Sequence, residues 1–292
     1  MHPRCLVRCT GKHAGLARRD GDGPAGRETS GQRPPQGRAG APDPRWPPRP
    51  APPPRRPPAV HRPSSTYALD HYTFTYAPSA QALYHARAAA QRPSNSLLAV
   101  RYPDKRFQLA DQAVRAALET FPPEKRKALL MNEARKAAVR QAFGEYNVLF
   151  FFTHGVADFA NPPASGLEMA VAPGDAPEEA RLTLAEIFDL RSQNTRLAVL
   201  AACETGVPSD LKTMDEVVSL PSGLMQAGVP GVIGSLWSVA ESSTAILMSI
   251  FFEEWRTNGL TPPQALRRAQ QRLRVEKFSH PFYWAAFTFT GL

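Results

Sequence analysis

Two apolar runs, each ending at a reactive side chain, constrain this chain more than any other feature. The run VLFFF leads through Thr153 to His154 and Gly155, and the run LAVLAA leads directly into Cys203. Apolar runs of this length are typical of parallel strands buried on both faces. Because ligands and chemistry collect at the carboxyl edge of a parallel sheet, we expect His154 and Cys203 at the same edge. A thiol beside an imidazole is the smallest nucleophile–base pair, so the pattern indicates thiol chemistry.

The remaining patterns alternate between strands and helices. We expect strands over 72–78, 97–102, the run before His154, 197–202, 231–237 and the C-terminal WAAFTFTG, and helices over 79–90, 108–120, 132–143, 183–190, 216–227, 241–258 and 261–275. Such alternation predicts an α/β fold with a mostly parallel sheet and helices on both faces, which is a three-layer sandwich.

Residues 1–63 have a different composition. They hold 13 Lys and Arg against 4 Asp and Glu, which accounts for the whole net charge of +9, and they hold 15 of the 30 prolines. Such a segment buries too little apolar surface to offset its chain entropy. We therefore expect a disordered Pro/Arg-rich tail over 1–63 and one domain over 64–292. The tail's charge suits weak contact with nucleic acid, without a specific site, although GC-rich composition or a mis-set start explains it more simply.

Cysteine usage and hydropathy indicate a soluble cytoplasmic protein. Three cysteines in 292 residues make no disulfide framework, and no stretch reaches the roughly 20 apolar residues of a membrane helix. The N-terminal apolar stretch is too short for a signal peptide. The Cys and His residues before position 14 match no zinc spacing well, so we expect no metal.

Eight sequence blocks, taken in order, resemble the CHAT domain, a branch of the caspase-like cysteine peptidases that includes separase. The blocks are YAPS (76–79), LLAV (97–100), FFTHG (151–155), LAACETG (200–206), the helix before Ala227-Gly228, GVIGSLWSV (231–239), ALRRAQQRLR (265–274) and HPFYWAAF (280–287). The resemblance implies a caspase-like sandwich with His154 as general base and Cys203 as nucleophile. It implies oxyanion N–H groups from Gly155 and Cys203, hydrolysis of a protein substrate through a thioester, and no metal or organic cofactor.

The resemblance also suggests a substrate pocket. In arginine-cleaving relatives such as separase, an acidic residue stands where this chain has Glu241, which favours a basic residue before the cut. The alternative is that Glu241 only starts a helix, where its charge suits the helix dipole. Trp237 is interpreted as core or cleft wall. Asp158 is the candidate near the site for orienting His154.

Two departures from the family pattern leave the activity open. Residues 237–241 read WSVAE instead of the usual W-P-V-D-D, and residues 214–217 read MDEV where the family has a glycine-acidic-glycine loop. We therefore expect the loop 207–219 to need a regulatory protein partner to become ordered. The rival interpretation is a scaffold or signalling module with dormant proteolysis.

Overall fold

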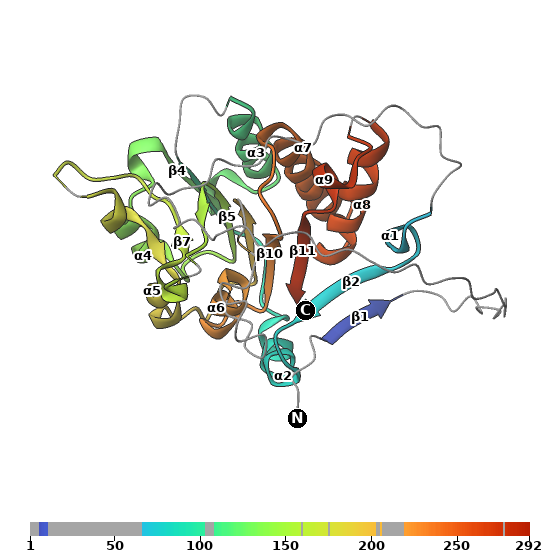
Figure 1. Ribbon diagram of the computed structural model, residues 1–292, viewed down its shortest axis with the longest axis horizontal. Helices are drawn as coiled ribbons and strands as arrows, with labels where there is room; N and C mark the ends of the chain where they lie inside the picture. Colours follow the sequence, from blue (N-terminus) through green and yellow to red (C-terminus); the bar gives the residue numbers. More distant parts are fainter. Residues whose placement is uncertain are drawn as a thin grey trace, which may run out of the picture. The chain divides into compact units, whose positions relative to one another are not determined.

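Among the described residues, the main sheet has eight strands. The computed structural model describes residues 6–10, 66–102, 108–158, 160–174, 176–202, 205, 219–276 and 278–292. The strand order is β1-β2-β11-β10-β9-β5-β3-β4 (Figure 1). In chain order the strands are β1 (Leu6–Thr10), β2 (Thr73–Ala77), β3 (Leu97–Arg101), β4 (Arg126–Leu130), β5 (Val148–Phe152), β9 (Leu197–Ala201), β10 (Gly231–Ser235) and β11 (Phe287–Gly291).

Five neighbouring strands, from β10 to β4, are mutually parallel. Strand β11 is antiparallel to β10 and parallel to β2, and β2 is antiparallel to β1. Every residue of β3, β5, β9 and β10 is buried, as expected for strands covered on both faces. The predicted mostly parallel sheet is confirmed.

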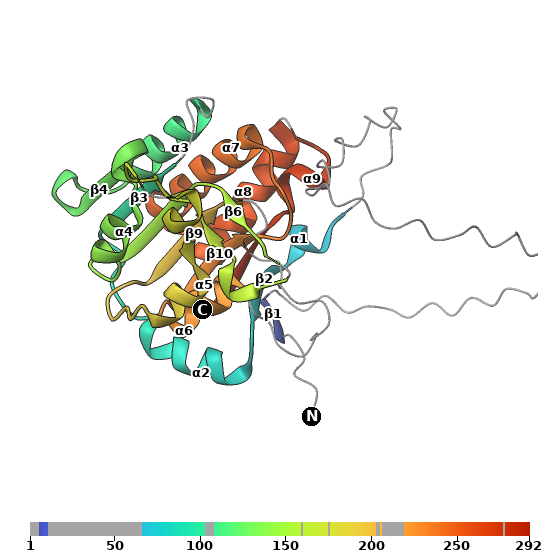
Figure 2. The same ribbon diagram turned by 60° about the vertical axis from the view of Figure 1, so that its left-hand side comes forward.

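Helices cover both faces of the sheet (Figures 1 and 2). Alternate residues of β5 show the two layers, because Phe150 packs into one core with the first group of helices and Phe151 into a second core with the other group. The first group is α3 (Gln108–Glu119), α7 (Glu241–Phe252), α8 (Pro262–Glu276) and α9 (Pro281–Trp284), and the second is α4 (Lys136–Ala142), α5 (Leu184–Asp189) and α6 (Leu220–Gln226). Two further helices, α1 (Ala68–His71) and α2 (Ala80–Ala89), flank the β2 side. The three-layer sandwich is therefore confirmed.

Several helices begin where the sequence has a capping residue, and some begin later than predicted. Ser79, Thr183 and Ser219 each accept a backbone N–H as N-cap residues of α2, α5 and α6. The helix predicted over 132–143 begins only at Lys136, because a 3₁₀ turn over Met131–Glu133 precedes it. Strand β4 was not predicted, because its RKALL sequence lies at the sheet edge and is only partly buried.

The predicted tail differs from the structure at one place. Leu6–Thr10 form the edge strand β1 on β2, where we expected no regular structure. The rest of segment 1–63 lies outside the described residues. Within the described part of the chain, none of the helices has the length and apolarity needed to cross a bilayer.

Candidate functional site

His154 lies just beyond the carboxyl end of β5. In the parallel pairing of β5 with β9, Phe152 stands opposite Ala201. His154 follows Phe152 by two positions, and Cys203 follows Ala201 by two positions in the sequence. Cys203 itself lies outside the described residues, so its predicted place beside His154 stays a prediction. The register nevertheless brings the two chain segments to the same edge of the sheet.

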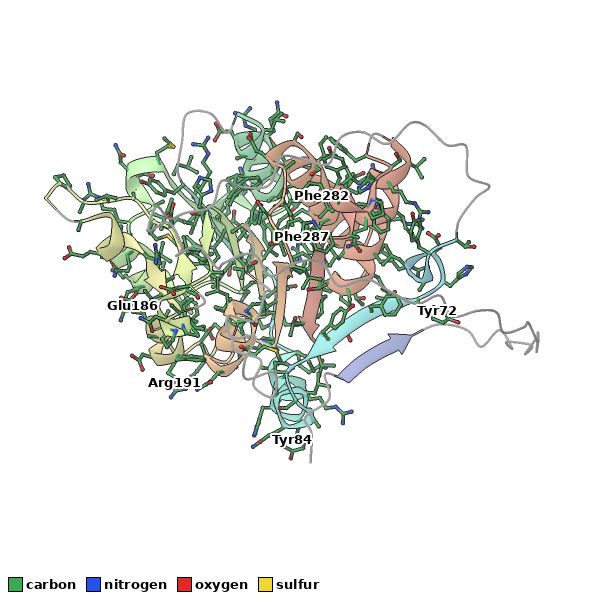
Figure 3. The ribbon with its side chains drawn as sticks, viewed as in Figure 1. Tyr72, Tyr84, Glu186, Arg191, Phe282 and Phe287 are labelled. Atoms are coloured by element: carbon green, nitrogen blue, oxygen red, sulfur yellow. The ribbon has the colours of Figure 1, made fainter. Side chains whose placement is uncertain are left out.

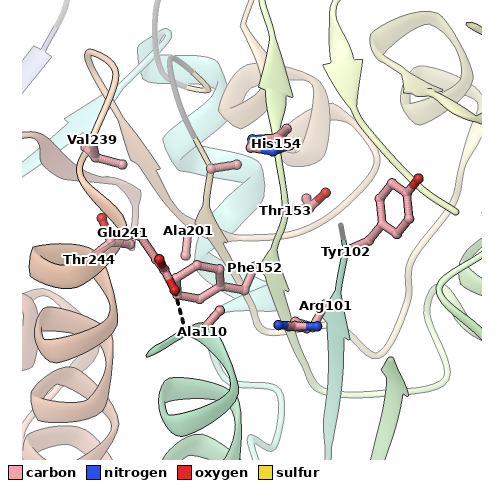
Figure 4. A pocket seen from close by; sticks show the side chains of 11 residues that line it. Arg101, Tyr102, Ala110, Phe152, Thr153, His154, Ala201, Val239, Glu241 and Thr244 are labelled. Atoms are coloured by element: carbon pink, nitrogen blue, oxygen red, sulfur yellow. Dashed lines mark hydrogen bonds between the residues drawn. The ribbon is translucent and has the colours of Figure 1, made fainter. Parts of the chain in front are cut away.

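A pocket opens at this edge (Figure 4). It holds about 510 Å³ of empty space and is lined by Arg101, Tyr102, Ala110, Phe152, Thr153, His154, Ala201, Ala202, Val239, Glu241 and Thr244. These residues come from the ends of β3, β5 and β9 and from the starts of α3 and α7. His154, Glu241 and Ala202, the residue before Cys203, thus line the same pocket.

A small three-stranded sheet follows His154 and fixes the direction of Gly155. Its strands are β6 (Gly155–Val156), β7 (Gly166–Leu167) and β8 (Leu182–Thr183). Gly155 is opposite Leu167, and the flanking bond runs from the Glu168 N–H to the His154 carbonyl at 2.9 Å. This pattern marks a non-hydrogen-bonded pair, so the Gly155 N–H points away from β7. That direction leaves it unused by the small sheet.

The residue before His154 adds a second attachment to the same neighbour. The buried Thr153 hydroxyl donates to the Glu168 carbonyl, while the Glu168 N–H donates to the His154 carbonyl. Two consecutive residues are therefore held by one residue of the adjoining segment. The backbone that carries the imidazole is thus fixed by the segment that contains Glu168.

Glu241 has a structural contact that the sequence did not reveal. It is the first residue of α7, and its Oε1 accepts the N–H groups of Leu109 (3.0 Å) and Ala110 (3.1 Å). Those N–H groups belong to the first turn of α3, which has no carbonyl partners of its own. The Glu241 carboxylate therefore caps α3 while it also lines the pocket (Figure 4). Its predicted role at a helix start applies to a neighbouring helix as well as its own.

Arg101 is the main pocket residue that the sequence analysis missed. Its side chain is only 6% exposed, and its Nε lies 3.0 Å from Asp111 Oδ1 in an ion pair that lacks hydrogen-bond alignment. Its Nη1 also donates to the Met131 sulfur, and Met131 adopts a positive φ of 51°. In Figure 4 the Phe152 ring lies between Arg101 and Glu241. The pocket therefore carries both signs of charge.

The other predicted pocket residues occupy different surroundings. Asp158 Oδ1 accepts the N–H groups of Ala160 and Asn161, which shapes its own turn. The Trp237 indole donates to the Phe282 carbonyl at 3.0 Å. Asp158 and Trp237 are not among the described residues that line the pocket. Thr244 does line it, although its position in the sequence did not indicate this. The Thr244 hydroxyl is buried and has no hydrogen-bond partner among the described residues.

Among the described residues, no group of three His, Cys, Asp or Glu side chains is arranged to hold a metal ion. The polar groups of the pocket are a guanidinium, a carboxylate, an imidazole and hydroxyls. Such groups can bind polar side chains and transfer protons.

Comparison with solved structures gives the separase–securin complex of Saccharomyces cerevisiae, with a TM-score of 0.53 and 15% sequence identity over 74% of this chain and 13% of that chain. The Arg-specific cysteine proteinase gingipain R matches with a TM-score of 0.47 and 12% identity, over 72% of this chain and 50% of that chain. At these identities the likeness concerns the fold alone. This chain therefore spans a small part of the separase chain.

A curated relative is tetratricopeptide repeat protein 28 of Mus musculus, which is 32% identical over 114 residues. The match covers 39% of this chain and 4% of the mouse protein. The family model of the CHAT domain matches residues 56–292, which is most of the chain. The predicted family is confirmed, and this chain belongs to the CHAT domain family.

Proposed function

We propose that this chain is a cysteine endopeptidase in which His154 and Cys203 form the catalytic dyad. The observation that carries the proposal is the register of β5 and β9, which brings the segments that lead to both residues to one sheet edge. The pocket at that edge is lined by His154 and by Ala202. A nucleophile and a base delivered beside one pocket are what acyl transfer needs.

The proposed reaction proceeds by acyl transfer. His154 takes the thiol proton, and the Cys203 sulfur attacks the carbonyl carbon of the peptide bond. The N–H groups of Gly155 and Cys203 donate to the resulting oxyanion, and the direction of the Gly155 N–H away from β7 agrees with this role. His154 then returns the proton to the leaving amine. Water hydrolyses the thioester and restores the thiol.

We further propose that the enzyme cleaves after a basic residue held by Glu241. Oε1 of Glu241 is already bonded to two N–H groups of α3, and Oε2 makes no hydrogen bond within the described residues. A single available oxygen reduces the advantage of the two-pronged Arg over Lys. The buried Arg101 in the same pocket weakens the attraction for any cation. The preference for basic residues should therefore be modest, with Arg and Lys nearly equal.

A protein partner is proposed to regulate the activity. The separase in the structural comparison was solved as a complex with securin. Residues 207–218 lie outside the described part of the chain. The sequence of residues 214–217 departs from the family pattern. We therefore expect low basal activity in the purified chain and higher activity when a partner is added.

The test is labelling by a peptidyl acyloxymethyl ketone that carries Lys or Arg before the reactive carbon. The wild-type chain should label at Cys203. Replacing Cys203 by Ala should abolish labelling, and His154→Ala should slow labelling and peptide hydrolysis by about three orders of magnitude or more. Cys9→Ala is the matched control and should label normally. A Cys203→Ala variant that hydrolyses peptides at the wild-type rate would refute the dyad.

The second candidate function is a non-catalytic scaffold or signalling module. The observation that favours it is the mouse relative, whose name describes a repeat protein and whose aligned part is 4% of its length. A scaffold would fold and bind partners without labelling at Cys203. The probe experiment, repeated with candidate partners present, separates a dormant enzyme from a chain without catalytic capacity.

A further inference from the structure

The edge of the sheet opposite the candidate site holds two arginines close together. Arg92, which follows α2, donates from Nη1 to the carbonyl oxygens of Ser192 (3.3 Å), Thr195 (2.8 Å) and Gly228 (2.6 Å). Three carbonyls on one nitrogen fix the guanidinium in place. Its Nε and Nη2 make no hydrogen bond within the described residues. Arg92 is therefore a rigid cation with donors to spare.

Arg196 lies against the same two chain segments. It directly follows Thr195, and its Nη1 is 3.1 Å from the position that a Cβ on Gly231 would occupy. Both guanidiniums thus border the loop over 192–196 and the turn over 228–231. Arg196 Nη1 is buried and has no hydrogen-bond partner in the described part of the chain. A buried donor without a partner normally has a ligand or an ordered water that supplies one.

No acidic side chain of the described residues forms an ion pair with either arginine. The backbone oxygen of Leu292, the last described residue, lies 3.4 Å from the same point above Gly231 and makes no hydrogen bond with Arg196 Nη1. Burial lowers the pKa of both arginines, and the charge of Arg92 lowers the pKa of Arg196 further. Two partly buried like charges that no acidic side chain of the described residues pairs with are unfavourable, so an anion at this place would stabilise the fold.

An open hollow adjoins Arg92. It has about 1140 Å³ of empty space, part of it open to solvent, between α2 and α6, and Gly228, Val229 and Pro230 form part of its wall. The polar side chains of His85, Ser222 and Gln226 also line it. The Ser222 hydroxyl already donates to the Ser219 carbonyl, whereas His85 and Gln226 can donate hydrogen bonds to oxygen atoms in the hollow. The hollow therefore offers room and donors beside a fixed positive charge.

We propose that Arg92 and Arg196 form a binding site for an oxyanion of the phosphate class, at the amino edge of the sheet. The planar guanidinium suits tetrahedral oxyanions, because its N–H groups form a fixed fork. The hollow has room for the organic part of a phosphorylated small molecule. The site is separate from the pocket beside His154, so it stands whether or not the chain is a peptidase.

The experiment titrates the full chain with inorganic phosphate by calorimetry, and follows thermal unfolding in phosphate and in chloride at equal ionic strength. Arg196→Met keeps the aliphatic stem and removes the charge, while Arg191→Met is the control, since Arg191 is exposed on the neighbouring loop (Figure 3). Wild type and Arg191→Met should bind phosphate, and Arg196→Met should bind it about tenfold or more weakly. In chloride, Arg196→Met should unfold no earlier than wild type, because it removes an unpaired buried donor.

Additional variants and anions distinguish a specific site from general effects of salt. Arg196→Lys should retain part of the affinity, which covers the case in which Arg196→Met folds poorly. Acetate tests whether any anion suffices, and phosphorylated and unphosphorylated forms of one small molecule test whether the organic part adds affinity. Phosphate stabilises many proteins without binding to a site. An equal response of wild type, Arg196→Met and Arg191→Met would mean an adventitious ion only and would overturn the proposal.

Discussion

The two edges of the sheet are built differently. At the carboxyl edge, the strands end in polar side chains around an open pocket, and Thr153 and His154 are attached to Glu168 of the adjoining segment. At the amino edge, one arginine joins three carbonyls and a glycine turn packs against a neighbouring loop. The hydrogen bonds of Arg92 therefore stabilise the fold at the amino edge, while the carboxyl edge carries the pocket beside His154. Substitutions at the two edges should therefore separate stability from activity.

The largest effect on stability is expected for Arg92→Met. Loss of three bonds from a charged donor to buried carbonyls should lower the free energy of unfolding by about 3 kcal/mol. Urea unfolding measures this, with Arg87→Met on α2 as the matched control. Hydrolysis per folded molecule should be unchanged. A loss of activity at full stability would break the comparison between the edges.

Gly228→Ala should have the next largest effect, about 2 kcal/mol. Gly228 has a φ of +100°, and a Cβ there would lie 2.6 Å from the Ser192 carbonyl oxygen. Gly174→Ala is a control for the backbone conformation alone, because Gly174 has a φ of +93° with no atom within 4 Å. The difference between the two urea midpoints isolates the close contact. Equal midpoints would mean that this contact adds nothing to stability.

Glu241→Gln tests whether the contact between Glu241 and α3 stabilises the carboxyl edge. The amide oxygen can still accept the α3 N–H groups, so the free energy of unfolding should fall by only about 1 kcal/mol. Glu241→Ala should lower the free energy of unfolding by more, since the backbone N–H groups of α3 then have no capping carboxylate. Peptide libraries should show a reduced preference for Lys and Arg in both variants. An unchanged preference would leave Glu241 with the capping role alone.

The smallest effect is expected for Thr244→Val. The side chain keeps its shape and loses a buried hydroxyl that has no partner in the described part of the chain. The free energy of unfolding should rise by up to about 1 kcal/mol. Ser243→Ala is the contrasting variant on the same turn, because the Ser243 hydroxyl donates to the Ala240 carbonyl. A destabilised Thr244→Val protein would indicate a bound water or ligand at that hydroxyl.

The sequence predicted the sheet and both of its faces, because buried parallel strands appear as unbroken apolar runs such as VLFFF and LAVLA. It did not predict β4, since an edge strand needs no apolar run. It placed His154 at a strand end, and the same rule applied to the run 97–102 would have found Arg101 and Tyr102. The bond from Glu241 to α3 could not be predicted, because it depends on how two helices distant in sequence pack together. The predicted neighbour of His154, Cys203, lies outside the described residues.

The strand order has a consequence for synthesis on the ribosome. Strand β2 is made early, yet β11, made after every other strand of the main sheet, separates it from the five parallel strands. Those five can assemble as they emerge, but β2 has no place in the sheet until Phe287–Gly291 leave the exit tunnel. Nascent chains that stall before Phe287 should therefore present the unpaired edge of β10 together with an undocked, aromatic β2. We expect chaperones to bind such intermediates, because they expose an unpaired strand edge and apolar side chains.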